Sequence, residues 1–218
     1  MALSKIDVAN MLTGATPVAN GGTGLTSGTT GQFLKFTGST TLASTAVSEN
    51  AATVVDHWYL ASNTTAGTAG IIADSGGAGG GAWTKYMSGT SSVTTVTTGS
   101  GGGKFSFPVT GIYMITGHFC TYHNTDDNDM GISIQRTDNN FTNTTRLGYI
   151  RNSFNSTDGT PNAYHQGSSS AFIDVDDVSN DKFYFEVSSV ATNNYVFGGS
   201  GADGNFGTTC IIMRVGDT

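Results

Sequence analysis

The sequence predicts an all-β protein in which an extended N-terminal arm precedes a β-sandwich, and three observations lead to this fold class. Charged residues make up only 11% of the 218 residues, less than half of the usual quarter, so helices are poorly supported. The chain contains 31 glycines, and these glycines, with Asn and Asp, supply the backbone conformations of tight turns. Thr, Val, Ile, Tyr and Phe, which favour strands, are abundant.

Residues 1–13 are the first expected element, an anchor peptide. The apolar residues Ile6, Val8, Met11 and Leu12 lie among the polar Lys5, Asp7 and Asn10, and one helical turn or a short strand would place them on one face. A disordered chain end is the alternative. Because apolar residues at a terminus need a covering surface, we expect residues 1–13 to dock on another protein of an assembly.

Residues 14–50 are the second expected element, an extended shaft. This Gly/Thr-rich segment has too few apolar residues to offset the entropy of ordering as a single chain. Three copies wrapped around one axis would share enough contacts. We therefore expect an intertwined shaft rather than a compact domain.

The shaft contains a motif with a known likeness. Pro17-Val-Ala-Asn-Gly-Gly-Thr-Gly24, followed by Gly31-Gln-Phe-Leu34, resembles the repeat near the start of many bacteriophage fibre proteins. The resemblance is confined to these two short segments and implies a threefold intertwined shaft. It also implies that Phe33, Leu34 and Leu42 are axial contacts.

Residues 51–218 are the third expected element, a jelly-roll knob. Strand-like runs recur here at fairly even intervals and are separated by loops rich in Gly, Asn and Asp, which is typical of a sandwich or jelly roll. The expected strands are 54–60, 82–87, 104–122, 131–136, 146–151, 171–175, 182–190 and 208–215.

Two of these strands are apolar on both faces, although a free-standing sandwich should alternate apolar and polar residues. In the strand at 111–122 the two faces carry Ile112, Met114 and Cys120 on one side and Tyr113, Ile115 and Phe119 on the other. In the last strand they carry Cys210 and Ile212 against Ile211, Met213 and Val215. One face is covered by the second sheet, so we expect a neighbouring subunit to cover the other. The two cysteines are expected to be buried thiols rather than a disulfide.

The knob also resembles the C1q/tumour-necrosis-factor (TNF) family. The likeness lies in Phe105-Ser-Phe-Pro-Val-Thr-Gly-Ile-Tyr113, which fits the family pattern F-x-x-P-x-x-G-x-Y, in Ser170–Val175, in Asn180–Val187 and in Gly207–Met213. This resemblance implies a tight homotrimer with one sheet facing the threefold axis. The chain departs from the family in lacking a collagen-like stalk and in the glycine-rich segment at 61–81.

Net charge and segment composition exclude some partners. A net charge of −7 without any Lys/Arg run disfavours nucleic acid. The start lacks the features of a secretory signal and no apolar stretch approaches the length of a membrane span, so we expect synthesis in a host cytoplasm and no membrane insertion.

Acidic residues give two candidate cation sites, each with a simpler alternative. Oxygen ligands of the kind Ca²⁺ takes are expected in one loop that carries Asn124, Asp126, Asp127, Asn128 and Asp129. The loop lacks the spacing of an EF-hand, and a turn in which these side chains cap the backbone is the simpler interpretation.

Asp174, Asp176 and Asp177 form the second acidic group. Strand alternation would send Asp174 and Asp176 outward together, where they would either hold a cation or form an acidic edge that discourages aggregation. The acidic edge is the preferred interpretation, and we predict no metal and no cofactor for the chain.

Catalytic motifs are absent from the sequence. His118 and His123 are five residues apart on one strand, point to opposite faces and are not expected to form a metal pair. His57 and His165 have no carboxylate at useful spacing. With no nucleophile elbow, no phosphate-binding loop and only Glu49 and Glu186 as glutamates, we predict that the chain is not an enzyme.

These observations predict a trimeric phage fibre that attaches to a glycan or protein of the host surface through its knob loops. Tyr149, Tyr164, Tyr195 and Phe206 are candidate aromatic contacts there, with packing in the core or in an interface as the alternative role. A capsid-decorating head fibre is the alternative within the virion. A glycan-cleaving enzyme with carboxylates that meet across loops, and a cellular C1q-like lectin, are alternatives from other classes.

Overall fold

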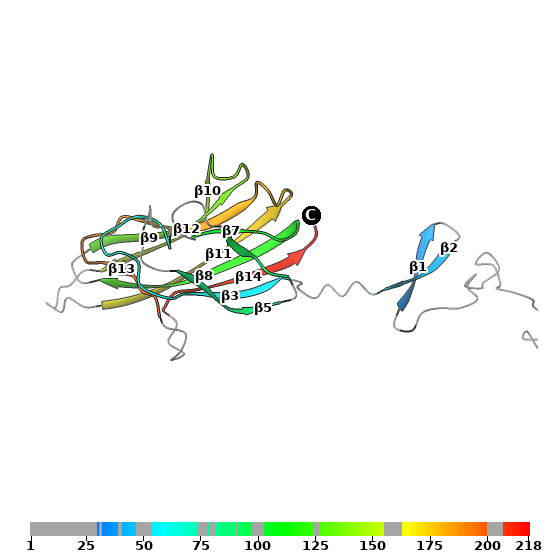
Figure 1. Cartoon of the computed structure of the whole chain (residues 1–218), viewed down its shortest axis with the longest axis horizontal. Coiled ribbons are helices and arrows are strands. Elements are labelled where there is room, and N and C mark those ends of the chain that lie inside the picture. The colour runs from blue at the N-terminus through cyan, green and yellow to red at the C-terminus, as the bar shows by residue number, and fades with distance from the viewer. Residues whose placement is uncertain are drawn as a thin grey trace, which may run out of the picture. The chain divides into compact units, whose positions relative to one another are not determined.

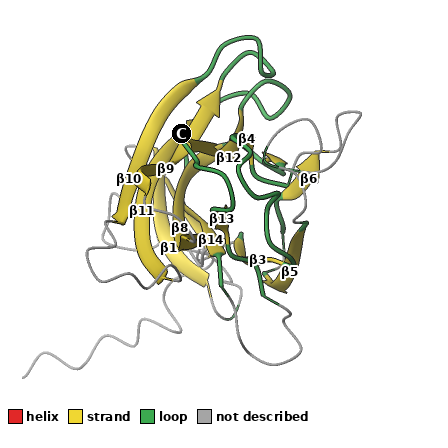
Figure 2. Cartoon of the chain, turned by 90° about the vertical axis from the view of Figure 1, so that its left-hand side faces the viewer, coloured by secondary structure: helices red, strands yellow, loops and turns green. Residues whose placement is uncertain are grey.

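The computed structural model is all-β in every residue that it describes: 30, 32–38, 41–46, 54–73, 78, 82–89, 91–96, 103–123, 127–154, 163–199 and 207–218. Figure 2 shows strands and loops, with no helix among these residues. The chain divides into two compact units, Met1–Glu49 and Asn50–Thr218. The predicted change from shaft to knob falls beside this division.

The described part of the first unit is a β-hairpin. Strand β1 (Gln32–Gly38) pairs antiparallel with β2 (Thr41–Ala46), and Phe36 lies opposite Leu42. Phe33 is 66% exposed and Leu34 53%. Local pairing within this segment was not foreseen, since we expected contacts only between chains. The anchor peptide at 1–13 lies outside the described residues, so it stays a prediction.

The second unit is a sandwich of two antiparallel sheets, seen as two layers in Figure 1. In the first, called the β9 sheet, the strand order is β10 (Thr145–Phe154), β9 (Asp127–Thr137), β12 (Lys182–Ser188), β7 (Lys104–Ser106) and β6 (Thr94–Val96), with β4 (Gly70–Ile71) also on β12. In the second, called the β8 sheet, it is β11 (Ala163–Val175), β8 (Gly111–His123), β14 (Thr209–Gly216), β3 (Val55–Leu60) and β5 (Trp83–Ser88), with β13 (Tyr195–Val196) also on β8.

Consecutive strands cross repeatedly from one sheet to the other. The chain passes between the two sheets from β7 to β8, from β8 to β9, from β10 to β11 and from β11 to β12. This alternation is the strand order of a jelly roll. The predicted all-β jelly-roll sandwich is therefore confirmed.

Aromatic side chains from both sheets fill the core. Phe105 of β7 stacks on Phe183 of β12 with ring centroids 4.8 Å apart, and Trp58 of β3 meets the Phe105 ring edge-on at 5.4 Å. Phe105 and Phe183 are fully buried. Alternation along β12 places Phe183, Phe185 and Val187 inward, so one short strand supplies much of the contact between the sheets.

The family-like motif at 105–113 forms the corner between β7 and β8. The Tyr113 hydroxyl donates a hydrogen bond of 2.8 Å to the carbonyl oxygen of Val109, and the Phe107 ring lies 4.5 Å from the Tyr113 ring. Gly111 has a φ of 138°, a conformation that side chains rarely adopt. The motif therefore turns the chain from one sheet into the other.

Several predicted strand bounds were wrong. The run at 104–122 is two strands in different sheets, because the corner at 107–110 separates β7 from β8. The strand predicted at 171–175 is only the end of β11, whose first part is polar and lies at a sheet edge with alternately exposed residues. The strand predicted at 131–136 begins earlier, as β9 does at Asp127.

Candidate functional site

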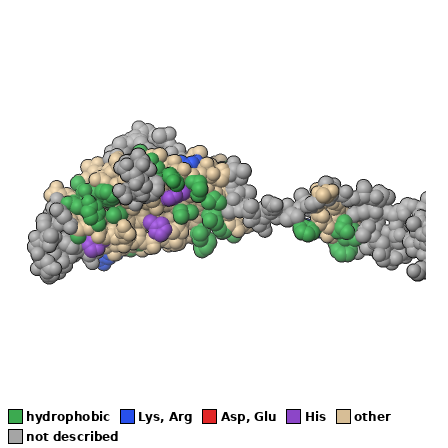
Figure 3. Space-filling model, turned by 90° about the horizontal axis from the view of Figure 1, so that it is seen from below, with side chains coloured by type: hydrophobic (Ala, Val, Ile, Leu, Met, Phe, Trp, Pro, Cys, Tyr) green, Lys and Arg blue, Asp and Glu red, His purple; other side chains and the backbone are tan. Residues whose placement is uncertain are grey.

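The outward face of the β8 sheet, which points away from the sandwich core, carries a continuous apolar row. One row across it is apolar on four neighbouring strands: Phe172 lies opposite Met114, Met114 opposite Met213, and Met213 opposite Val55. Phe172 is 64% exposed. Hydrophobic side chains gather over this side of the sandwich in Figure 3, with histidines between them. The predicted second apolar face is therefore present, and in a single chain its side chains are half-buried or exposed.

The residues of β8 and β14 divide between the two faces of the sheet as predicted, with one difference. Tyr113, Ile115 and Phe119 are buried toward the core, as are Cys210 and Ile212. Ile112, Met114, Ile211, Met213 and Val215 lie on the outward side and are half-buried or exposed. Cys120 takes an outward register position opposite Gln166 but is itself buried.

The far end of this face, away from the row with Val55, is aromatic. Tyr122 of β8 stacks on Tyr195 of β13 with centroids 4.7 Å apart, and its ring lies 5.1 Å from Tyr164 of β11. Tyr164 in turn meets Phe197 edge-on at 5.3 Å. Tyr164 and Tyr195, predicted in or near loops, lie at the starts of β11 and β13 and form one cluster.

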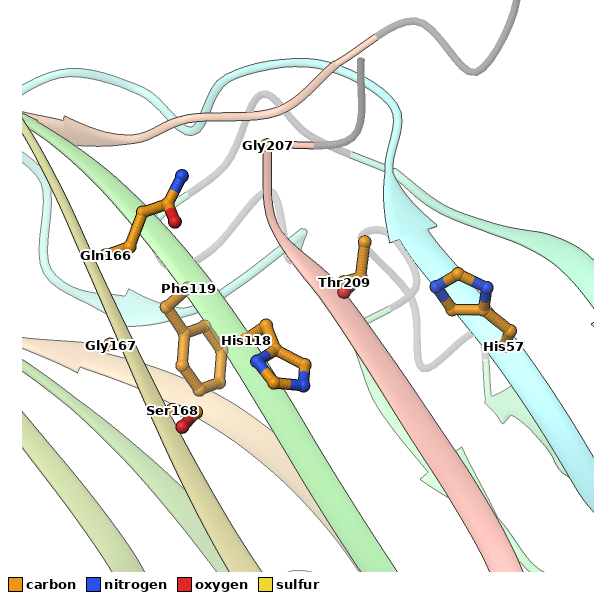
Figure 4. A pocket seen from close by; sticks show the side chains of 8 residues that line it. All are labelled: His57, His118, Phe119, Gln166, Gly167, Ser168, Gly207 and Thr209. Carbon is orange, nitrogen blue, oxygen red and sulfur yellow. The ribbon is translucent and has the colours of Figure 1, made fainter. Parts of the chain in front are cut away.

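A hollow of about 520 Å³ lies between these two ends of the face. Its lining includes side chains from four strands, with His57 from β3, His118 from β8, Thr209 from β14 and Gln166 and Ser168 from β11 (Figure 4). Gly167 and Gly207 complete the lining together with Phe119. The floor of the hollow is thus polar and carries no carboxylate and no Lys or Arg among the lining residues.

His57 and His118 are brought together across β14. His57 lies opposite Ile211, and His118 lies opposite Thr209, so the two imidazoles occupy adjacent rows on the same side of the sheet (Figure 4). Burial lowers the pKa of His57 below its ordinary value of 6.5, and the charge of His118 lowers it further. Sequence inspection missed this pair because the residues lie on strands far apart in the chain.

Histidines 123 and 165 form a second pair inside the sandwich. His123 is fully buried, and its ring meets that of His165 edge-on with centroids 5.2 Å apart. Thr121 Oγ1 lies 3.0 Å from His123 Nε2, and Asn152 Nδ2 donates to the same hydroxyl. His118 and His123 do point to opposite faces, as predicted.

The acidic residues do not form a cation site in the part of the chain that the structure describes. No group of three or more His, Cys, Asp or Glu residues there is arranged to hold a metal ion. Residues 124–126 lie outside the described residues, and Asp127 to Asp129 begin β9 rather than lying in a loop as predicted. The predicted calcium alternative therefore stays a hypothesis.

Asp177 and Asp181 shape the turn between β11 and β12. Asp177 Oδ1 accepts a bond of 2.8 Å from the backbone N–H of Ser179, which lowers the pKa of the exposed Asp177 carboxyl. The Asp181 carboxylate accepts hydrogen bonds from the backbone N–H groups of Asp176 and Asp177 and forms an ion pair with Arg136 at 3.0 Å. Asp174 and Asp176 are exposed.

The remaining candidates have packing roles. Cys120 and Cys210 are free buried thiols, as predicted, and burial raises the pKa of both. Glu186 accepts a bond of 2.8 Å from Gln135 Nε2 in a side-chain network of the β9 sheet. Tyr149 is 40% exposed and carries the Arg146 guanidinium over its ring. Phe206 and Glu49 lie outside the described residues, so the roles predicted for them are untested.

Comparisons with known proteins give a likeness in fold only. No protein-family model matches the chain, and no curated protein matches it. Murine APRIL in its crystal structure at pH 5.0 is 13% identical, covering 74% of this chain and 98% of that one with a TM-score of 0.49. Eiger TNF from S. frugiperda is 12% identical, covering 77% of this chain and 95% of its own, with a TM-score of 0.46. The jelly-roll assignment accordingly rests on the strand order.

Among the described residues, no helix has the length and apolar character to cross a membrane.

Proposed function

We propose that this chain is the subunit of a homotrimeric bacteriophage fibre, in which the knob self-associates through the outward face of the β8 sheet. The arm at 1–50 would join the knob to the virion. The observation that carries the proposal is the outward apolar row of Phe172, Met114, Met213 and Val55, in which Phe172 is 64% exposed and the other three are half-buried in the single chain. Soluble monomers rarely expose contiguous apolar patches of this kind unless they bind a partner.

The energetics favour covering this face. Burying one large apolar side chain stabilises an association by about 1.5–3 kcal/mol. Phe172, Tyr164 and Met87 are each more than half exposed in the single chain. Several such side chains per subunit supply enough free energy to offset the entropy lost on association.

The hairpin in the arm supports self-association independently of the knob. Phe33, Leu34 and Phe36 are all more than half exposed on β1. A two-stranded hairpin is marginally stable at best in water without a further layer to cover it. Copies of the same segment would provide that layer, which agrees with the intertwined shaft implied by the phage-fibre resemblance of 17–34.

Three subunits, rather than two, is the stoichiometry implied by both sequence resemblances. The phage-fibre repeat and the C1q/TNF-like motif at 105–113 each imply threefold symmetry. Three knobs on one axis would present their outer loops together, and the resulting avidity raises binding to a host surface through effective concentration.

Host contact is expected at one end of the knob. Val54 and Gly216 lie at the opposite end. Gly216 is opposite Ile112, at the start of β8, and the backbone N–H of the nearby Arg214 donates to the carbonyl oxygen of Val54. The aromatic cluster of Tyr122, Tyr164 and Tyr195 marks the end that is remote from the arm's attachment point at Val54. We assign host recognition to that end of the knob.

Sedimentation equilibrium of the chain with and without residues 1–50 tests the self-association. We expect a trimeric mass for the full chain and for the knob alone, because the apolar row belongs to the knob. A monodisperse monomer of the full chain at micromolar concentration would overturn the proposal.

Labelling of intact particles tests the place in the virion. Label confined to one vertex, or to the tail, supports a tail fibre. Label distributed over the whole capsid supports the decorating head fibre instead. Particles that contain none of the protein would refute both assignments.

A further inference from the structure

We infer that His57 and His118 make the association of the knobs acid-sensitive, so that protonation of this pair on the outward face of the β8 sheet loosens the trimer. The inference rests on the proposed function, because it concerns the same face. The observation behind it is the placement of two imidazoles in one hollow, within a face whose other outward side chains, Asp174 apart, are apolar or uncharged among the described residues.

The hollow would bring the imidazoles into the interface. His57 is half-buried already in the single chain, and the Tyr86 ring meets it edge-on at 5.6 Å. His118 is exposed and lies beside Thr209 of β14 and Ser168 of β11. A neighbouring knob that covers this face removes both imidazoles from water, which disfavours their charged forms.

The described groups around the pair provide little compensation for a positive charge. The strands beside the two imidazoles contribute Tyr59 of β3, Tyr86 of β5 and the buried Cys120 of β8 as titratable neighbours, and none of these three is a carboxyl group. No residue that lines the hollow is acidic.

The nearest acid on this face is remote. Asp174 is the single charged side chain at the outward positions of β11, β8, β14, β3 and β5 among the described residues. It lies six residues along β11 from Ser168, the neighbour of His118, which is about 20 Å of strand. That distance exceeds the Debye length of about 8 Å at physiological salt, so Asp174 does not offset an imidazolium in the hollow.

The two imidazoles also oppose each other. A proton on His118 lowers the pKa of His57, and burial lowers it in the same direction from 6.5. If association lowers the pKa of a histidine further by burying it, association is unaffected above the ordinary pKa and becomes weaker as the pH falls below that value. The trimer is therefore strongest above pH 6.5 and weakens on acidification.

Sedimentation velocity of the full chain at pH 7.5 and pH 5.5, over a series of concentrations, tests this. A difference of one pKa unit at a single histidine changes the association constant by about tenfold. We expect the concentration at which half of the trimer dissociates to rise at least about tenfold at pH 5.5. A double variant, His57→Gln with His118→Gln, is expected to dissociate equally at both pH values.

Controls separate the outcomes. His165→Gln removes a histidine that lies against His123 inside the sandwich, and we expect it to keep the pH effect. If the double variant does not fold, the single variant His118→Asn at an exposed position is expected to halve the number of titrating groups and reduce the effect. Far-UV circular dichroism at both pH values should show an intact β-sheet.

The outcomes that count against the inference are distinct from failure of the trimer itself. A wild-type trimer of equal strength at both pH values, a double variant that keeps the shift, or acid loss of β-sheet signal in both proteins would overturn it. A monomer already at pH 7.5 would refute the proposed function instead.

Discussion

At the scale of single residues, the corner between β7 and β8 shows how one position fixes a change of sheet. Gly111 has a positive φ, and a Cβ there would lie 2.4 Å from Arg214 Nε and 2.6 Å from the carbonyl oxygen of Gly216. The nearby Tyr113 hydroxyl bonds the Val109 carbonyl and holds the same corner. Strain and contact therefore both require glycine at 111.

Gly111→Ala is expected to destabilise the knob by at least about 1–3 kcal/mol, because alanine adopts this φ only with strain and its Cβ would clash. Urea denaturation measures the difference. Gly216→Ala is the matched control, since a Cβ there would meet only Ile112 Cδ1 at 3.9 Å. Equal midpoints for the two variants would contradict this account of the corner.

Asp56 makes the stability of the knob depend on pH. Its carboxylate is fully buried and accepts a hydrogen bond of 2.7 Å from the backbone N–H of Val93. Ser92 Oγ lies 3.1 Å from each of the two carboxylate oxygens. Burial raises its pKa above 3.8, although the Val93 bond and Lys85 partly offset the rise. The folded protein therefore holds this proton more tightly than the unfolded chain does.

We expect the unfolding free energy of the wild type to fall relative to Asp56→Asn as the pH rises from about 3.5 to 7. The contribution of a group with a raised folded pKa is complete below 3.8 and is lost as the pH rises through the folded value. Chemical denaturation at both pH values measures it. Asp138→Asn, at an exposed position, is the control, and a parallel response of both variants would refute the assignment.

At the scale of elements, two short neighbouring strands of the β9 sheet, β7 and β12, carry the aromatic side chains that pack against the β8 sheet. β7 has three residues and β12 seven, yet the stacked rings of Phe105 and Phe183 lie at the centre of the aromatic core. Trp58 and Trp83 of the β8 sheet both contact Phe105. The docking of the two layers depends on this one side chain more than on the length of its strand.

Phe105→Ala is expected to cost about 3–5 kcal/mol, the usual effect of truncating a buried aromatic ring in a core. The drop in thermal midpoint and in unfolding free energy checks it. Leu147→Ala on β10 is the control, because Leu147 is 37% exposed and a surface change costs only about 0.5 kcal/mol. A Phe105 variant as stable as the Leu147 variant would show that β7 is dispensable.

The elements also show what the sequence could and could not predict. Alternation in β8 and β14 identified which residues share a face, because strand geometry sends every second residue to the same side, but it did not show which face is the core. The first part of β11, Ala163 to Ser170, was missed because it is polar and edge-exposed. The pairing of His57 with His118 was also missed, since register between distant strands leaves no local signal.

At the scale of the whole molecule, folding and association depend on opposite faces of the same strands. The inner residues of β8 and β14 are buried within one chain, whereas Phe172 and its row are covered only by another copy under the proposed function. A mutation on the outward face should therefore separate the two processes. The knob would fold but stay monomeric.

Phe172→Asp is the change that makes this separation, because it removes an apolar contact and places an unpaired charge in the proposed interface. Phe172 is 64% exposed in the single chain, so we expect an unchanged circular dichroism spectrum. Losing about 1.5–3 kcal/mol of burial per contact, with the further cost of burying a charge, should weaken association by at least about 100-fold. Sedimentation velocity measures that weakening.

Val109→Asp introduces the same charge at a position 41% exposed in the corner between β7 and β8, away from the outward face, and should leave the trimer intact. If Phe172→Asp remains trimeric, the contact between knobs lies elsewhere on the sandwich.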